Sequence, residues 1–204
     1  MYDDRVSAGK LLAERLVDQG IRPDTAFAIP PGGVNVARPL YNRFDADLGL
    51  IVAELVRAPS TNSHPVGAVT DTGTSWINDD RIAAFDVDRT RLEAKQKEAF
   101  RDAREKHDVY EDIGSDPTSE GTVVLVSEAI TAETRLKACV SALDQGAGCY
   151  IVAAAPVGFS DAVAGVETIA DEVVVTETVT ETRLHRAFYD RFGSPIVPGA
   201  QQGE

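Results

Sequence analysis

The stretch TVVLVSEAITAETRLKACVSAL, residues 122–143, decides the fold class of this chain. It opens with the apolar run Thr122–Val126, which predicts a buried strand. The apolar residues of Thr131–Leu143 then recur at helical spacing, and Cys149–Ala155 follows as a second apolar run. Two strands separated by a helix imply a parallel sheet with a right-handed crossover, so this segment predicts an α/β domain.

Further apolar patterns extend this organisation toward the N-terminus. Ser7–Gly20 predicts an amphipathic helix capped by its first residue and stopped by its last. Thr25–Ile29 predicts a strand that ends at Pro30-Pro31-Gly32-Gly33, after which helical spacing resumes. Leu48–Val56 is an almost continuous apolar run, as expected for an inner strand covered on both faces.

The middle of the chain predicts a small antiparallel excursion. Gly67–Thr70 and Arg81–Asp86 flank the turn signal Asp71-Thr72-Gly73. Thr90–Lys106 predicts a charged helix with a thin apolar seam, which lies on the surface or against a partner. Glu172–Val175 predicts one more strand.

Length and termini predict a single domain over residues 1–194 and a flexible tail over residues 195–204, which are rich in Pro, Gly and Gln. The longest apolar runs are far shorter than the roughly 20 residues that cross a bilayer. The first residues carry no basic-then-apolar signal, so we expect a cytoplasmic protein.

The formal net charge of −13 argues against nucleic acid as a partner, because phosphate backbones are bound by clustered Lys and Arg. Such an acid-rich, Lys-poor composition is typical of a halophilic cytoplasm, where a large net charge keeps proteins soluble. An ordinary acidic cytosolic protein has the same composition.

The cysteines and histidines predict no metal centre. Cys139 and Cys149 lack C-x-x-C spacing, so buried free thiols are expected. His64, His107 and His185 are widely separated in the sequence.

Several short motifs occur along the chain in a definite order. They are Asp4-Arg5 with Ala8-Gly9, Ile29-Pro30-x-Gly32-Gly33-Val34, Gly67-Ala68-Val69, Val123–Leu136, Ala155-Pro156-Val157 and Phe188-Tyr189-x-x-Phe192. In their order and spacing these motifs resemble those of the type I phosphoribosyltransferases, in particular the predicted phosphoribosyltransferases of bacteria and archaea. The resemblance covers most of the chain and implies a parallel sheet flanked by helices, with a small hood.

The resemblance assigns Ser127 and Glu128 to the ribose site. In that family two acidic residues at these places contact the ribose hydroxyls of phosphoribosyl pyrophosphate. Here the pair is Ser127 and Glu128, so one carboxylate survives, lengthened by a methylene. Glu128 is the catalytic residue that the resemblance implies if the protein is active.

The phosphate loop of the resemblance falls at the start of the predicted helix, on Thr131 and the four positions after it. The family's Thr-Gly-Ala-Thr becomes Ala132, Glu133, Thr134 and Arg135. Glu133 adds a negative charge where a phosphate dianion binds, which opposes binding. Its carboxylate either fills the anion site itself or serves as an ordinary stabilising acid at a helix start.

The pyrophosphate loop of the resemblance is Pro30-Pro31-Gly32-Gly33, where the family's usual arginine is replaced by Pro31. A proline there favours the cis peptide that is common in this loop. A plain tight turn is the alternative. Arg57 takes the place of the family's usual lysine, and the next acidic position aligns near Ser63. Arg57, Arg104 and Arg135 are candidate phosphate donors.

Three function hypotheses follow. The altered loop favours a non-catalytic or regulatory homologue that binds a nucleotide, a nucleobase or phosphate. The alternative is an active enzyme of nucleotide metabolism that transfers 5-phosphoribosyl between pyrophosphate and a nucleobase, with Mg²⁺ as cofactor. The third is a structural or oligomerisation module, with a homodimer formed through Thr90–Lys106. Ala68–Phe85 and Phe159–Thr168 are candidate hood segments.

Overall fold

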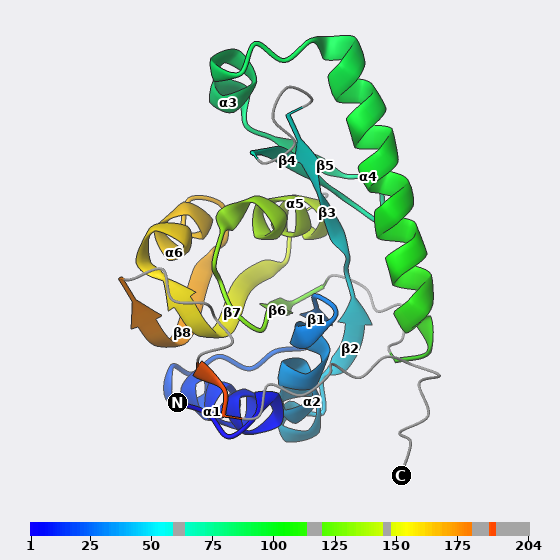
Figure 1. The fold of residues 1–204 in the computed structure, drawn as a ribbon. Helices are drawn as coiled ribbons and strands as arrows, with labels where there is room; N and C mark the ends of the chain where they lie inside the picture. Colours follow the sequence, from blue (N-terminus) through cyan, green and yellow to red (C-terminus); the bar gives the residue numbers. More distant parts are fainter. Residues whose placement is uncertain (59–63, 114–119, 145–147, 181–187, 191–204) are drawn as a thin grey trace.

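A five-stranded parallel sheet lies at the centre of the structure, a computed structural model that describes residues 1–58, 64–113, 120–144, 148–180 and 188–190 (Figure 1). All neighbouring strands in this sheet run parallel. In spatial order the strands are β2 (Asp47–Leu50), β1 (Thr25–Ala28), β6 (Thr122–Val126), β7 (Tyr150–Phe159) and β8 (Glu172–Val179).

Helices cover both faces of this sheet (Figure 1). α1 (Arg5–Asp18) and α2 (Gly32–Phe44) lie on one face, and α5 (Glu133–Leu143) and α6 (Ser160–Val166) lie on the other. Alternate residues of β6 point to the two sides and are almost completely buried, which explains its unbroken apolar run. The α/β architecture expected from the sequence is confirmed.

A second, antiparallel sheet stands above α5 in Figure 1. It consists of β3 (Ala53–Arg57), β4 (Pro65–Thr70) and β5 (Ser75–Ile77), and together with α3 (Asp79–Ala84) it forms what we call the hood. The long helix α4 (Arg89–Tyr110) flanks the hood and continues into a short 3-10 turn, Glu111–Ile113. The small antiparallel excursion is therefore confirmed.

The apolar seam of α4 is covered within the chain. Ala99 and Ala103 are buried, and Ala99 belongs to the same cluster as Val56, Val66 and Val69 of the hood. The expected charged helix is confirmed, and its seam packs on the hood. The seam is therefore already buried against the hood and is not exposed for the homodimer contact of the third hypothesis.

Leu48–Val56 was expected to be one inner strand, and this prediction is wrong. The run divides between two sheets: β2 is an edge strand of the parallel sheet, and β3 belongs to the hood. At the division, the backbone N–H of Val52 donates to the Asp71 carboxylate at 3.0 Å, and the Asp71 N–H donates to the Val52 carbonyl at 2.9 Å. These bonds to a distant turn replace the pairing that would have continued the strand.

Two smaller expectations also differ from the structure. The N-cap of α1 is Asp4, and Ser7 is its capping-box partner three residues later. The segment Arg81–Asp86 is largely helical, because Asn78 caps α3 by accepting from the Arg81 N–H at 2.9 Å. The strand opposite β4 is instead β5.

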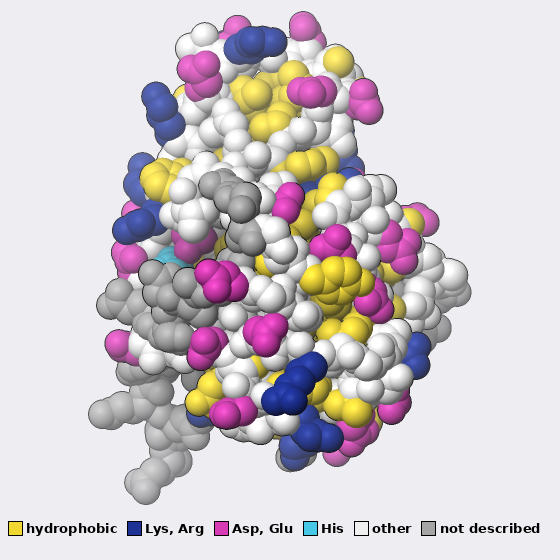
Figure 2. Space-filling view, turned by 180° about the vertical axis from the view of Figure 1, so that it is seen from behind, with side chains coloured by type: hydrophobic (Ala, Val, Ile, Leu, Met, Phe, Trp, Pro, Cys, Tyr) yellow, Lys and Arg dark blue, Asp and Glu magenta, His cyan; other side chains and the backbone are white. Residues whose placement is uncertain are grey.

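Cys139 and Cys149 are confirmed as buried free thiols, and burial raises the pKa of both. No helix in the described part of the chain is both long and apolar enough to cross a membrane. Acidic side chains are spread over the face in Figure 2, in keeping with the net charge of −13. Ser63, His185, Phe192 and residues 195–204 lie outside the described residues.

Candidate functional site

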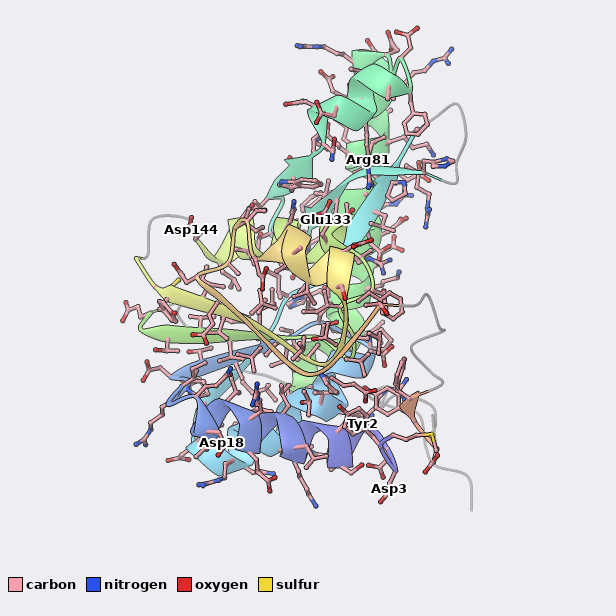
Figure 3. All side chains as sticks on the ribbon, turned by 90° about the vertical axis from the view of Figure 1, so that its left-hand side faces the viewer. Tyr2, Asp3, Asp18, Arg81, Glu133 and Asp144 are labelled. Atoms are coloured by element: carbon pink, nitrogen blue, oxygen red, sulfur yellow. The ribbon has the colours of Figure 1, made fainter. Side chains whose placement is uncertain are left out.

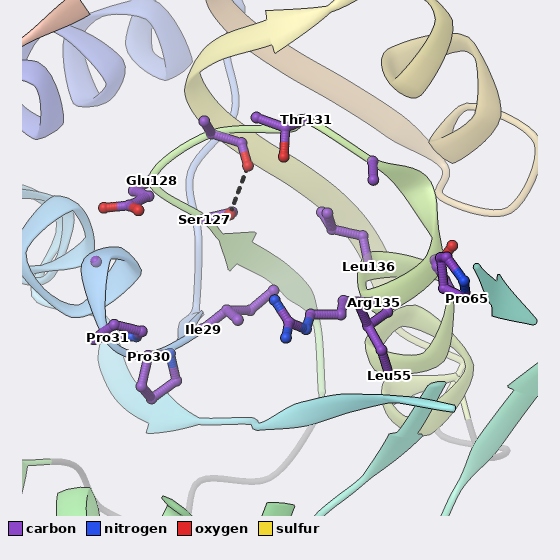
Figure 4. A pocket seen from close by; sticks show the side chains of 14 residues that line it. Ile29, Pro30, Pro31, Leu55, Pro65, Ser127, Glu128, Thr131, Arg135 and Leu136 are labelled. Atoms are coloured by element: carbon purple, nitrogen blue, oxygen red, sulfur yellow. Dashed lines mark hydrogen bonds between the residues drawn. The ribbon is translucent and has the colours of Figure 1, made fainter. Parts of the chain in front are cut away.

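A cavity of about 210 Å³ opens where β1 and β6 end, the edge at which open α/β sheets bind ligands (Figure 4). The loop after β1, the loop after β6 and the start of α5 supply most of its wall, and the hood contributes Leu55 and Pro65. The lining residues are Ile29, Pro30, Pro31, Gly32, Leu55, Pro65, Ser127, Glu128, Ala129, Thr131, Ala132, Thr134, Arg135 and Leu136.

The loop after β1 forms one wall of the cavity. Its Pro30–Pro31 peptide bond is cis, as the sequence indicated. The next two residues begin α2 and allow close approaches: a Cβ on Gly32 would lie 1.8 Å from the Glu128 carboxylate, and one on Gly33 would lie 2.6 Å from the Val126 carbonyl oxygen. The paired glycines therefore let α2 approach the end of β6.

Glu128 is held by residues from both ends of the chain. The Arg5 Nε donates to Glu128 Oε2 at 2.6 Å, and the Arg5 side chain is only 5% exposed. The Tyr189 hydroxyl donates to the Glu128 carbonyl at 2.8 Å, and the centre of its ring lies 5.9 Å from the Arg5 guanidinium carbon. Figure 4 shows the Glu128 carboxylate turned toward α2 rather than toward the middle of the cavity.

We expect the buried Tyr189 phenol to make the stability of the fold fall as the pH becomes strongly alkaline. Burial raises the pKa of the Tyr189 phenol above its usual 10.0, and the Glu128 charge raises it further. Since the folded state holds this proton more tightly, its contribution to stability is complete below about pH 10 and is lost as pH rises through the higher folded value. We expect the free energy of unfolding, measured with urea, to fall more steeply above about pH 10 in the natural protein than in Tyr189→Phe.

Tyr41→Phe, which removes an exposed phenol from α2, is the matched control and should keep the natural slope. Equal slopes in Tyr189→Phe and the natural protein would contradict this role of Tyr189.

Ser127 and Thr131 occupy different positions in the loop after β6. The Ser127 hydroxyl donates to the Ala129 carbonyl at 3.0 Å, so it stabilises the loop itself. Thr131 is exposed, and its hydroxyl points into the cavity (Figure 4). Of the two hydroxyls, the one on Thr131 is therefore directed into the cavity.

The start of α5 forms the opposite wall. Its N-cap, Ala132, makes no side-chain cap hydrogen bond, and Thr134 is 2% exposed. The Arg135 side chain extends into the cavity (Figure 4). Its Nη2 lies 3.5 Å from Glu54 Oε2, and Glu54 Oε1 accepts from Lys106 Nζ at 2.7 Å. A helix N-terminus and a guanidinium therefore face the same space.

Glu133 lies at the start of α5, but its carboxylate points elsewhere. Oε2 is 2.9 Å from Lys137 Nζ and lies over Gly165 of α6, where a Cβ would be 1.8 Å away. Figure 3 shows Glu133 beside α6, below Arg81 of the hood. The carboxylate is thus engaged by Lys137, a contact that favours the second of the two alternatives, an ordinary acid at a helix start.

Most of the residues proposed from the sequence line the cavity, but Gly33, Glu133 and Arg57 do not. Arg57 ends β3, opposite Pro65. Arg104 lies exposed on α4. Sequence reasoning assigned no role to Arg5, although it belongs to the motif Asp4-Arg5, and it missed the pair Glu54 and Lys106.

The described lining offers little to a metal ion by itself. Glu128 is its one carboxylate, and Arg5 already binds that group. Among the described residues, no three His, Cys, Asp or Glu side chains gather as ligands would. Mg²⁺ usually keeps several waters and binds through substrate phosphates, so these residues do not form a magnesium site of their own.

No family model matches the chain. Two curated relatives from Mycobacterium tuberculosis are each 29% identical to it over 181 residues. They carry the names "Putative phosphoribosyl transferase MT0597" (strain CDC 1551 / Oshkosh) and "Putative phosphoribosyl transferase Rv0571c" (strain ATCC 25618 / H37Rv). These relatives support the resemblance of this chain to phosphoribosyl transferases. The match covers 87% of this chain and 40% of each relative, so the chain spans about two fifths of their length.

Solved structures share the fold. The crystal structure of TT1426 from Thermus thermophilus has a TM-score of 0.81 and 27% identity, and the match covers 95% of this chain and 92% of that one. A hypothetical protein from Neisseria gonorrhoeae with bound ppGpp has a TM-score of 0.51 and 15% identity, over 88% and 85% of the two chains. The second likeness concerns the fold alone.

Proposed function

We propose that this chain binds a 5-phosphorylated ribose, as phosphoribosyl pyrophosphate or as a nucleotide, with the phosphate at the start of α5. The observation that carries this proposal is the position of Glu133: its carboxylate pairs with Lys137, which leaves the helix N-terminus open to an anion. Thr131 and Arg135 line the same space and supply a hydroxyl and a cation. The phosphoribosyl transferase relatives support the same ligand class.

We further propose that binding is not followed by efficient transfer. Ser127 donates its hydroxyl to its own loop, and the Glu128 carboxylate is engaged by Arg5. The two side chains at the ribose positions are therefore already committed to contacts within the protein. Transfer depends on groups aligned with the developing charge, and one lost donor of this kind costs about 3 kcal/mol. A non-catalytic or regulatory homologue fits this arrangement.

An active transferase is the second candidate, and the open start of α5 favours it. Calorimetric titration with phosphoribosyl pyrophosphate, with and without Mg²⁺ and at high salt, separates the two when pyrophosphate release is followed in the presence of nucleobases. Binding without release supports the non-catalytic homologue, and release identifies a transferase. Absence of binding contradicts the proposed ligand class. Because one structure of the same fold holds ppGpp, that nucleotide is a useful additional probe.

Arg135 provides a direct test of the anion site. Arg135→Met should weaken binding of phosphoribosyl pyrophosphate about ten- to hundredfold, because a charge-assisted hydrogen bond contributes roughly 1.5–3 kcal/mol. Calorimetry measures the change. Arg101→Met, which removes an exposed arginine from α4, is the matched control and should bind as the natural protein does. Equal affinity of the two variants would contradict a role for Arg135 in the site.

A further inference from the structure

We propose that Lys137 is a positioning residue that keeps the phosphate site open by holding the Glu133 carboxylate away from it. This inference rests on the proposed function, because it concerns the same anion site at the start of α5. It assigns a role to a residue that does not line the cavity.

The first support is the geometry of the ion pair. Glu133 is the first residue of α5 and Lys137 lies one turn later, with Oε2 and Nζ 2.9 Å apart. A glutamate four residues before a lysine is the favourable orientation on a helix. The Lys137 side chain is only 11% exposed, so solvent screens this pair less than it screens a surface pair.

The second support is that Lys137 is itself fixed in place. Its Nζ lies 4.9 Å from the centre of the Trp76 ring of β5, within the range of a cation–π contact. The ammonium group is therefore held between the Trp76 ring and the Glu133 carboxylate. This arrangement directs Glu133 along the helix and away from the N-terminal amides.

The third support comes from α6, on the other side of the carboxylate. A Cβ on Gly165 would lie 1.8 Å from Glu133 Oε2, so the glycine leaves the space that the carboxylate occupies. Two independent features, a lysine on α5 and a glycine on α6, thus place the same group. If either Lys137 or Gly165 is replaced, the carboxylate can turn toward the positive end of α5, where it would compete with phosphate.

Titration with phosphoribosyl pyrophosphate tests the proposal by calorimetry and by fluorescence of Trp76, the single tryptophan of the chain. Lys137→Met should weaken binding about tenfold or more, since a freed carboxylate beside a dianion is strongly repulsive. Adding Glu133→Gln to Lys137→Met should restore the affinity. Gly165→Ala should weaken binding as well and be rescued by the same change.

Lys95→Met is the matched control, because it removes one lysine charge from an ion pair on α4, outside the cavity. It should bind as the natural protein does. Failure of Glu133→Gln to rescue Lys137→Met would overturn the proposal, since a merely structural role of Lys137 would not depend on the Glu133 charge.

A crystal structure of Lys137→Met provides a test that needs no ligand. We expect the Glu133 carboxylate to move to the N-terminal amides of α5. A carboxylate that stays over Gly165 would overturn the inference even if the natural protein binds phosphate. If the natural protein binds no phosphate but the carboxylate moves, the positioning role of Lys137 stands and the proposed function fails.

Discussion

Replacing Gly33 by alanine is expected to lower the free energy of unfolding by about 3 kcal/mol. The new Cβ would lie 2.6 Å from the Val126 carbonyl oxygen, a contact with backbone at the end of β6. Since neither α2 nor β6 can move aside without disturbing the core, the clash is not relieved by a side-chain rotation. Urea denaturation followed by circular dichroism measures the loss.

Gly20→Ala is the control for this prediction. Gly20 has a positive φ of 74°, but a Cβ there would meet no atom within 4 Å. Its cost is the left-handed backbone alone, roughly 1 kcal/mol. If Gly33→Ala is no more destabilising than Gly20→Ala, then α2 and β6 are not packed as closely as described.

The sequence predicted the central β-α-β unit well because its signals are local. The strand predicted at Thr122–Val126 has the observed bounds, and the helix ends at Leu143 as expected. An apolar run buried on both faces needs no information about distant residues. The helix begins two residues later than expected, because Thr131 and Ala132 turn toward the cavity instead of continuing the helix.

The predictions for Leu48–Val56 and Arg81–Asp86 failed for different reasons, a distant turn in the first case and a local helix cap in the second. An apolar run does not show which sheet each of its halves will join. In Leu48–Val56 the turn at Asp71 binds Val52 and so divides the run between two sheets. The second segment is short and lacks a strong period, so a single cap at Asn78 determines its helix.

The features of the candidate site also differ in how well the sequence predicts them. Loop composition located the cavity walls, since glycines, prolines and helix starts mark the ends of parallel strands. The sequence could not reveal which charged groups pair. Arg5 and Glu128 are 123 positions apart, and Glu54 is 81 positions from Arg135. Even the pair of Glu133 and Lys137, which is local in sequence, depends on distant residues: Gly165 leaves space for the carboxylate, and the Trp76 ring contacts the ammonium group.

Glu128→Gln is expected to lower the free energy of unfolding by about 3 kcal/mol. The change keeps the shape of the side chain but removes the negative charge 2.6 Å from a guanidinium that is 5% exposed. A buried cation depends on its counter-charge far more than an exposed one does. Urea denaturation at neutral pH measures the effect, and Arg5→Met combined with Glu128→Gln should cost less than the sum of the single changes.

Glu98→Gln is the matched control because its ion pair with Lys95 has nearly the same length, 2.7 Å, but lies in solvent on α4. Solvent screens exposed pairs so strongly that they contribute little to stability, so this variant should be almost as stable as the natural protein. Equal costs for Glu128→Gln and Glu98→Gln would mean that burial does not strengthen the Arg5 pair. In that case Glu128 could leave Arg5 and bind a ribose hydroxyl, and the ion pair would no longer oppose transfer.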